Sequence, residues 1–147
     1  MRISRKVLSR TIGNQFCLTL LSRQKFSSSG KFEKVVGYSR AVKVGNLIFV
    51  SGTTGTDADG KLVSAQDSYA QTKKAIENIE SALSKAGASL MHVVRTRVFV
   101  RADADWHSVA KAHEESFHSI LPASSMLVCS FLDPNILVEI EADAVVD

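Results

Sequence analysis

Carboxylates alternate with apolar residues through residues 137–146, and no other feature of the chain constrains its fold as strongly. Side chains of a β-strand point to opposite faces in turn, so a strand here has one apolar face and one acidic face. The acidic face carries Glu139, Glu141 and Asp143. Like charges along one strand raise each other's pKa, so such a face is favourable only where it meets water, cations or a ligand. The pattern predicts a half-buried strand and leaves open a solvated surface or a ligand site for its acidic face.

The other patterns predict further strands interrupted by two helices. Gly45-Asn46 tolerates the positive φ of a two-residue hairpin turn, and Asp57-Ala58-Asp59-Gly60 is typical of a polar turn. Apolar residues recur at a period of two in the strands and at helical spacing in the helices. The expected segments are strands at 36–44 and 47–51, a helix from a Ser64 cap to about Ala86, a strand at 91–101, a helix that follows Asp103 or Asp105 and ends before Pro122, and strands at 125–131 and 137–146.

This order, ββαβαββ, predicts an α+β domain with both helices on one face of a sheet. The chain has 147 residues, 45% of them hydrophobic, which is enough for one globular core and too little for two. The second face of the sheet must then be covered by something other than the predicted helices.

Positive charge is concentrated at the start of the chain. Residues 1–31 hold seven of the 18 basic residues and no acid, whereas the other 11 bases are outnumbered by all 15 acids. This segment is rich in Arg and Ser, with Arg2, Arg5, Lys6 and Arg10 on one side of a helical projection. These features indicate an organelle transit peptide at residues 1–30, cleaved near residues 26–29. Import into the mitochondrial matrix is favoured over a chloroplast or a disordered cytosolic tail.

Several other kinds of site have little support. The four histidines have no metal-ligand spacing, and no cofactor or metal is expected. Cys129 follows an apolar run, which indicates a buried, inert thiol. The segment 52–55 does not match a phosphate loop, and no segment approaches the roughly 18 apolar residues of a membrane span. Arg95, Arg97 and Arg101 share one strand face, where ion pairs with the last strand are favoured over an anionic ligand.

Three segments joined to the acidic strand resemble the RidA (YjgF) family. They are GYSRAVKVGNLIFVSG at 37–52, VRTRVFV at 94–100 and LPASS at 121–125, and the similarity runs from about Val36 to Asp147. The resemblance implies a chorismate-mutase-like domain at residues 34–147 with a mixed sheet. It also implies a homotrimer in which three sheets pack around an axis, with small-molecule clefts between neighbouring protomers.

The resemblance also implies site residues. In the family's enzymes an arginine in a Pro-Ala-Arg-Ser motif binds the carboxylate of a 2-imino acid, and a glutamate on the last strand positions the attacking water. Ammonia and a 2-keto acid are released. Carried onto this chain, the catalytic glutamate is Glu139, and Tyr38, Ser51 and Gly52 are substrate-binding residues.

Ser124 stands at the arginine position, so this chain represents a branch that lacks the deaminase arginine. Ser125 and Met126 complete the substrate-binding residues that the resemblance implies. A serine offers one neutral hydroxyl where arginine offers a bidentate cation. The loss of a charge-assisted hydrogen bond costs about 1.5 to 3 kcal/mol, or roughly 10- to 150-fold in binding. Efficient 2-imino acid deamination is therefore not expected unless Arg40 or Arg97 substitutes from another direction.

Three functions remain open at this point. The protein is a hydrolase of imine, enamine or related C–N bonds that uses Glu139, a trimer that binds a metabolite without turnover, or an RNA-directed translation inhibitor or ribonuclease. The acidic balance outside the leader and the absence of a basic-aromatic stripe disfavour the third. The expected partners are a second and third copy of the chain and a small-molecule metabolite, with no membrane and no nucleic acid.

Overall fold

The computed structural model describes residues 22–28 and 30–147 and contains one six-stranded sheet. The strands are β1 (Arg23–Phe26), β2 (Ala41–Val44), β3 (Leu47–Thr54), β4 (Val93–Arg101), β5 (Ala123–Cys129) and β6 (Val138–Val145). The helices are α1 (Lys31–Val36), α2 (Ser68–Lys85) and α3 (Trp106–Phe117), with a 3-10 turn at Leu90–His92.

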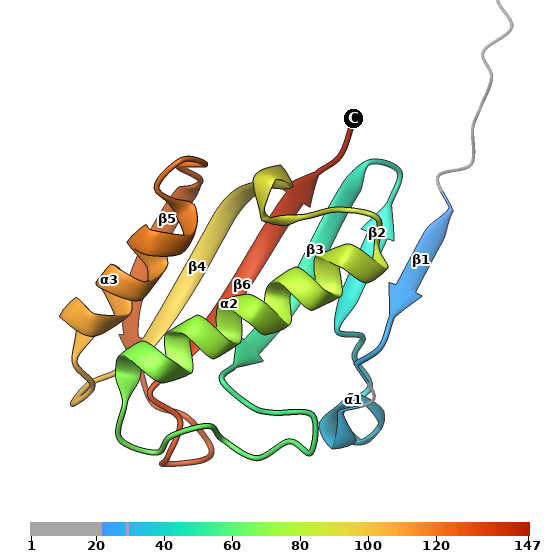
Figure 1. Cartoon of the computed structure of the whole chain (residues 1–147). Helices are drawn as coiled ribbons and strands as arrows, with labels where there is room; N and C mark the ends of the chain where they lie inside the picture. The colour runs from blue at the N-terminus through green and yellow to red at the C-terminus, as the bar shows by residue number, and fades with distance from the viewer. Residues whose placement is uncertain (1–21, 29) are drawn as a thin grey trace, which may run out of the picture.

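The sheet is mixed, with the strand order β1-β2-β3-β6-β4-β5 (Figure 1). Strands β4 and β5 are parallel and every other neighbouring pair is antiparallel. The last strand of the chain, β6, therefore lies in the middle of the sheet between β3 and β4. The order of elements from β2 to β6 and the α+β class confirm the prediction from the sequence.

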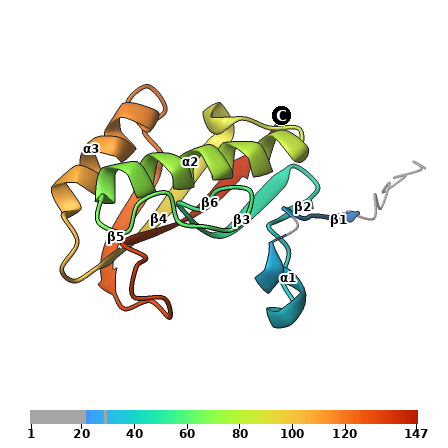
Figure 2. The same ribbon diagram turned by 60° about the horizontal axis from the view of Figure 1, so that its bottom comes forward.

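Both long helices pack on one face of the sheet, as predicted (Figure 2). Helix α2 begins after Asp67, whose carboxylate accepts a hydrogen bond from the backbone N–H of Ala70, and α3 begins after Asp105, which caps it in the same way. Beneath them lies the core, to which β6 contributes Val138, Ile140, Ala142 and Ala144. None of these helices is long and apolar enough to span a membrane, and the same is true of α1.

Neither α2 nor α3 covers the opposite face, which we call the open face (Figure 2). It carries the three carboxylates of β6, and Arg97 of β4 donates hydrogen bonds to Glu141 at 3.4 Å and Asp143 at 3.1 Å. Phe49 and Leu127 are exposed on this face. At the sheet edge, every residue of β5 up to Val128 is exposed, and Val128 has 72% of its surface accessible. Large apolar patches of this kind mark interaction surfaces.

The N-terminal part of the fold departs from the predicted pattern. The strand expected at 36–44 begins only at Ala41, because residues 31–36 form α1 and Gly37 ends that helix at φ 81°. The cap expected at Ser64 is Asp67, so α2 starts later than predicted. Residues 23–26, within the expected leader, pair with β2 as the edge strand β1.

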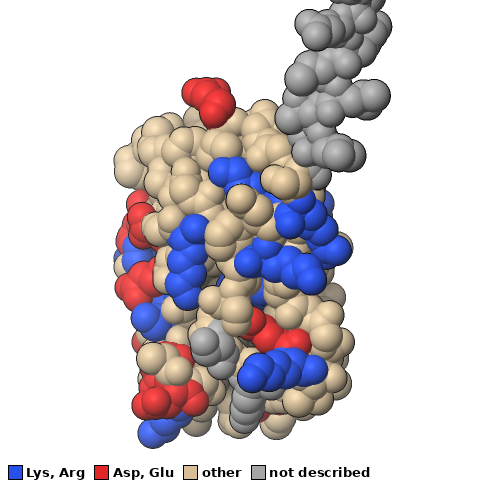
Figure 3. Space-filling view, turned by 90° about the vertical axis from the view of Figure 1, so that its right-hand side faces the viewer, with Lys and Arg blue, Asp and Glu red and all other residues tan. Residues whose placement is uncertain are grey.

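Lysine and arginine side chains gather on the side of the molecule where β1 and β2 lie (Figure 3). Lys43 and Lys85 of this side donate hydrogen bonds to the carbonyls of Ala86 and Ser27, both at 3.0 Å. Positive charge along an edge strand opposes pairing with another chain, so this edge is protected from aggregation.

Gln71 joins three segments beneath α2. Its side chain is fully buried, donates to the carbonyls of Ser64 and Asn135, and accepts from the backbone N–H of Leu137 at 2.9 Å. Gly55 allows this approach, since a Cβ there would collide with the Gln71 backbone.

We expect Gln71→Leu to lower the free energy of unfolding by about 2 to 4 kcal/mol, because it strands buried backbone groups without partners. Urea unfolding followed by circular dichroism measures the change. Gln66→Leu, an exposed glutamine just before α2, is the matched control and should stay within about 0.5 kcal/mol of wild type. Equal stability of the two variants would contradict this role of Gln71.

Candidate functional site

Glu139 lies near the start of β6 on the open face, and its carboxylate packs directly against Gly52 of β3. A Cβ added at Gly52 would overlap the Oε1 atom and the carboxyl carbon of Glu139. The register of β3 and β6 shifts between Val50 and Thr53, and this irregularity places the Gly52 backbone beside the carboxylate. A side chain at position 52 would therefore displace the Glu139 carboxylate from this place.

Burial raises the pKa of the Glu139 carboxyl above its ordinary value, and the nearby charge of Glu141 raises it further. The positive charge of Arg40 acts in the opposite direction. Within the described residues, the Glu139 carboxylate accepts no hydrogen bond and forms no salt bridge, unlike Glu141 and Asp143 beside it. A half-buried carboxyl with a raised pKa and free lone pairs is suited to accept a proton from water.

Arg40, which precedes β2, ties the neighbouring parts of the site together. Its Nη1 donates to the Gly52 carbonyl at 2.6 Å and to the Thr53 hydroxyl at 3.0 Å, and its Nη2 donates to the Tyr38 hydroxyl at 2.9 Å. The side chain is 15% exposed. Arg40 has little capacity to act as a substitute anion anchor, because most of its donors are already engaged by the protein.

Glu33 of α1 forms an ion pair with Arg40. Its Oε1 lies 3.9 Å from the Arg40 Nε, and the same carboxylate accepts hydrogen bonds from the Ser27 hydroxyl at 2.6 Å and the Ser28 backbone N–H at 3.0 Å. Burial alone would raise the pKa of Glu33, but the hydrogen bonds from Ser27 and Ser28 hold it below its ordinary value. The segment around α1 is therefore part of the support for Tyr38.

A pocket of about 410 Å³ lies between Tyr38 and this support, lined also by Lys25, Lys34 and Glu33. Ser51, expected in the cleft, donates its hydroxyl to the Ser39 carbonyl at 2.8 Å and fixes the approach of that loop to β3. Four of the expected site residues are thus brought together: Tyr38, Ser51, Gly52 and Glu139.

Ser124, Ser125 and Met126 lie elsewhere in the protomer. They belong to β5, which β4 separates from β6. Ser124 and Met126 pair in register with the buried residues Thr96 and Val98, so their side chains are on the helix side of the sheet, opposite to Glu139. Ser125 pairs with Arg97 and lies on the open face. One protomer therefore holds two separate halves of the expected site.

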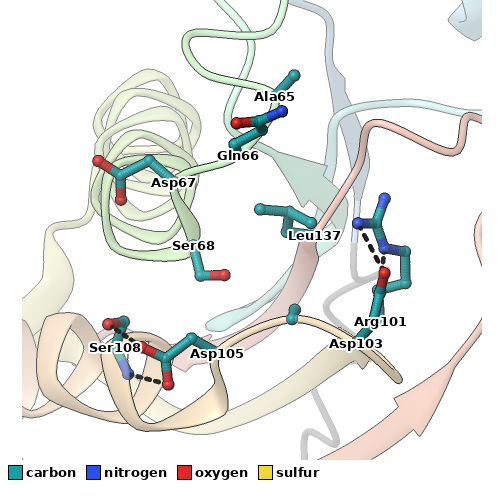
Figure 4. Close-up of a pocket in the computed structure, with 10 residues that line it drawn as sticks. Ala65, Gln66, Asp67, Ser68, Arg101, Asp103, Asp105, Ser108 and Leu137 are labelled. Atoms are coloured by element: carbon teal, nitrogen blue, oxygen red, sulfur yellow. Dashed lines mark hydrogen bonds and ion pairs between the residues drawn. The ribbon is translucent and has the colours of Figure 1, made fainter.

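A second pocket, of about 470 Å³, lies between the N-terminal ends of α2 and α3 (Figure 4). Asp67 and Asp105 line it, and both carboxylates accept hydrogen bonds from the first turns of their helices. Arg101 is paired with Asp103 in its wall. No residue singled out by the family resemblance lines this pocket, so we do not assign the site to it.

The described residues contain no group of three or more His, Cys, Asp or Glu side chains arranged to hold a metal ion. Cys129 of β5 is half-buried, and burial together with the charge of Glu139 raises the pKa of its thiol. A thiol that stays protonated is a poor nucleophile.

The fold and these residues define a small α+β domain in which the Glu139 carboxylate, with its raised pKa, lies on the open face of the sheet. The family model described as Endoribonuclease L-PSP matches residues 29–146. The chain belongs to this family, the RidA (YjgF) family, which confirms the resemblance seen in the sequence.

Similar proteins support this assignment. The chain is 33% identical over 107 residues to the 3-aminoacrylate deaminase RutC of Acinetobacter baylyi, covering 73% of this chain and 85% of the relative. A Pyrococcus abyssi RutC family protein is 38% identical over 115 residues, or 78% of this chain and 91% of that protein. A solved structure of a YjgF/YER057c/UK114 family member from Mycobacterium tuberculosis has a TM-score of 0.76 and 45% identity, over 85% of this chain and 100% of that one.

The raised pKa of Glu139 predicts a pH-dependent cost in stability. A carboxyl whose pKa is higher in the folded state contributes stability below its unfolded pKa, and this contribution is lost as the pH rises through the folded pKa. Glu139→Gln should therefore be more stable than wild type near pH 7. The two proteins should be equally stable near pH 3.5, because at about this pH the Glu139 carboxyl is mostly neutral in both the folded and the unfolded state. Urea unfolding at the two pH values measures this difference.

Glu80→Gln, an exposed residue of α2, is the control for the loss of one negative charge and should change stability by less than about 0.5 kcal/mol. A Glu139→Gln gain of the same size at both pH values would contradict the assignment of the effect to ionisation.

Proposed function

We propose that this protein is a homotrimer that hydrolyses an imine or enamine C–N bond in a cleft between protomers. The observation that carries the proposal is the Glu139 carboxylate, which is half-buried against Gly52, has a raised pKa and has no hydrogen-bond partner among the residues that the structure describes. The relative from Acinetobacter baylyi acts on 3-aminoacrylate, an enamine, which supports the same class of substrate here.

The proposed reaction needs only water and a proton acceptor. Glu139 orients water and accepts one of its protons while the water oxygen bonds to the C=N carbon of the imine tautomer. The nitrogen gains that proton, which gives a carbinolamine. The carbinolamine hydroxyl then loses its proton and the nitrogen takes up another, so the C–N bond breaks and ammonia and a carbonyl compound are released. Tyr38 and Ser51 shape the pocket, and the hydrogen bonds from Arg40 hold Tyr38 against β3.

Trimer formation is supported by the two separated half-sites and by the exposed apolar residues on the open face and β5. In one protomer Glu139 and Ser124 lie on opposite faces of the sheet, so a cleft that contains both requires a second copy. Sedimentation equilibrium of the folded protein should give about three times the monomer mass of the chain used. A monomer at micromolar concentration would rule the trimer out.

The part of the substrate that faces Ser124 is proposed not to be a carboxylate, because a neutral hydroxyl binds an anion weakly. Ser124→Arg should create a carboxylate anchor and raise ammonia release from freshly generated 2-iminobutanoate by about one to two orders of magnitude. Glu139→Gln in that background should remove the gain. An inert, folded Ser124→Arg trimer would instead favour a metabolite-binding role without turnover.

Mixed trimers test whether two protomers share each cleft. Wild type lacks the introduced arginine, and the double variant Ser124→Arg, Glu139→Gln lacks the carboxylate. If the cleft lies between protomers, unfolding and refolding the two together should produce some clefts with both groups and restore ammonia release. The same proteins refolded separately and then combined are the control. No gain after co-refolding, with Ser124→Arg itself active, would place the whole cleft in one protomer.

An RNA-directed role is the second candidate, favoured by the description of the family model and by the basic side at β1 and β2. A salt-dependent shift of RNA mobility without ammonia release from imines would support it over the hydrolase.

We also propose that the N-terminal leader directs import into the mitochondrial matrix. The hydrogen bonds from Ser27 and Ser28 to Glu33 favour processing before β1 over processing at residues 26–29. Residues 1–22 fused to a fluorescent reporter should reach mitochondria, and changing Arg2, Arg5 and Arg10 to Glu should abolish this because import needs the basic face. Diffuse fluorescence from the unaltered fusion would refute the proposal.

A further inference from the structure

A chain of hydrogen bonds runs from the inside of the protein to Ser124. Thr96, in the middle of β4, is 0% exposed, and its hydroxyl oxygen lies 3.0 Å from Nε2 of His113 and 2.9 Å from the Ser124 hydroxyl oxygen. His113 is half-buried on α3, and Ser124 is exposed on β5. Three separate elements thus contribute one polar group each to a continuous path.

The direction of this chain depends on the imidazole. The Thr96 hydroxyl has one proton, so it donates either to His113 or to Ser124. In the structure Thr96 donates to Ser124. When the Thr96 hydroxyl turns to donate to Nε2 of a neutral His113, Ser124 donates to Thr96 and presents its oxygen lone pairs to solvent. Burial lowers the pKa of His113 and favours the neutral form that this direction requires.

No charged side chain competes for the imidazole among the described residues. The ring of Phe117 on the same helix packs against the imidazole in a tilted arrangement, with ring centroids 4.6 Å apart, and Thr96 contacts the imidazole from β4. The charged groups between α2 and α3 gather around Tyr69 instead. Glu115 accepts a hydrogen bond from the Tyr69 hydroxyl at 2.6 Å and lies 3.8 Å from Lys73. The Lys111 ammonium lies over the Tyr69 ring.

We propose that Ser124, Thr96 and His113 form a proton relay for the second half of the hydrolysis. The inference rests on the proposed function, because it requires a substrate in the cleft. After water has added to the C=N carbon, the resulting carbinolamine must lose its O–H proton for the C–N bond to break. Ser124 accepts that proton and passes its own to Thr96, which passes its proton to Nε2 of His113.

The step is balanced without any further reactant. The electrons of the O–H bond form the carbonyl. The amine nitrogen takes up a proton from solvent, so the electrons of the C–N bond leave with neutral ammonia, and the imidazolium then returns one proton to solvent. Only Ser124 meets the substrate, while Thr96 and His113 act through it. The position that holds a carboxylate anchor in the family's enzymes would here serve an uncharged carbinolamine, which defines neutral imines as the substrate class. Ser124→Arg exchanges the relay for a carboxylate anchor, so its gain with 2-iminobutanoate should be accompanied by a loss of turnover with neutral imines.

The test uses Thr96→Val, which keeps the shape of the side chain and breaks the relay. We expect about a 10- to 100-fold loss in kcat for ammonia release from a neutral imine generated in the assay, with little change in KM. Thr72→Val is the matched control, since Thr72 is also fully buried but donates only to the Ser68 carbonyl of its own helix. It should keep the wild-type kcat.

The pH profile separates a relay from a structural role. Both Glu139 and His113 must be deprotonated to accept protons, so kcat should fall as the pH is lowered through either pKa. His113→Gln should lower kcat and leave a shallower acid limb that belongs to Glu139 alone. Adding Thr96→Val to His113→Gln should cause little further loss, since both act in one path.

The outcomes distinguish the two proposals. Wild-type trimer with no turnover of imines overturns the hydrolase and the relay together. Active wild type with Thr96→Val equal to Thr72→Val, or an unchanged acid limb in His113→Gln, overturns the relay alone.

Discussion

The alternation along β6 is the constraint on which the rest of the structure depends. This strand lies in the middle of the sheet, so its two faces decide which side becomes the core and which side stays open. Val138 and Ile140 are fully buried under the helices, which stabilises the fold by about 1.5 to 3 kcal/mol for each side chain. Slipping the register by one residue would bury three carboxylates instead, so the pairing of β6 with both neighbours is strongly specified.

The three carboxylates of β6 differ because of what stands beside each on the neighbouring strands. Glu141 and Asp143 pair with Arg97, and these half-exposed ion pairs contribute little to stability, about 0 to 1 kcal/mol. Arg97 offsets part of the negative charge on this face, although the charge of Glu141 still raises the pKa of Glu139. Glu139 instead faces Gly52, where burial keeps its pKa high. Glu139 can therefore act as a proton acceptor while Glu141 and Asp143 form ion pairs. The difference arises from the backbone register of β6 and from the absence of a Cβ at Gly52.

The sequence predicted the elements wherever the signal was local. A period of two marked β4 and β6, helical spacing marked α2 and α3, and Gly45-Asn46 marked the hairpin of β2 and β3, whose glycine has φ 60°. The strand β1 carried no such signal. Four residues with one large apolar side chain have no measurable period, and they form a strand because the edge of β2 offers unpaired backbone groups.

The site followed the same division. The sequence by itself determined that Glu139 shares a face with other carboxylates, because this depends only on residue identity and spacing, and the family resemblance placed Ser124 at the position of an arginine. The tertiary structure alone decided that Arg40 holds Tyr38 and Gly52, and that Ser124 connects through Thr96 to His113. Those contacts join residues 12 to 28 positions apart in three of the four cases, where strand order and register, rather than any local pattern, set the distances.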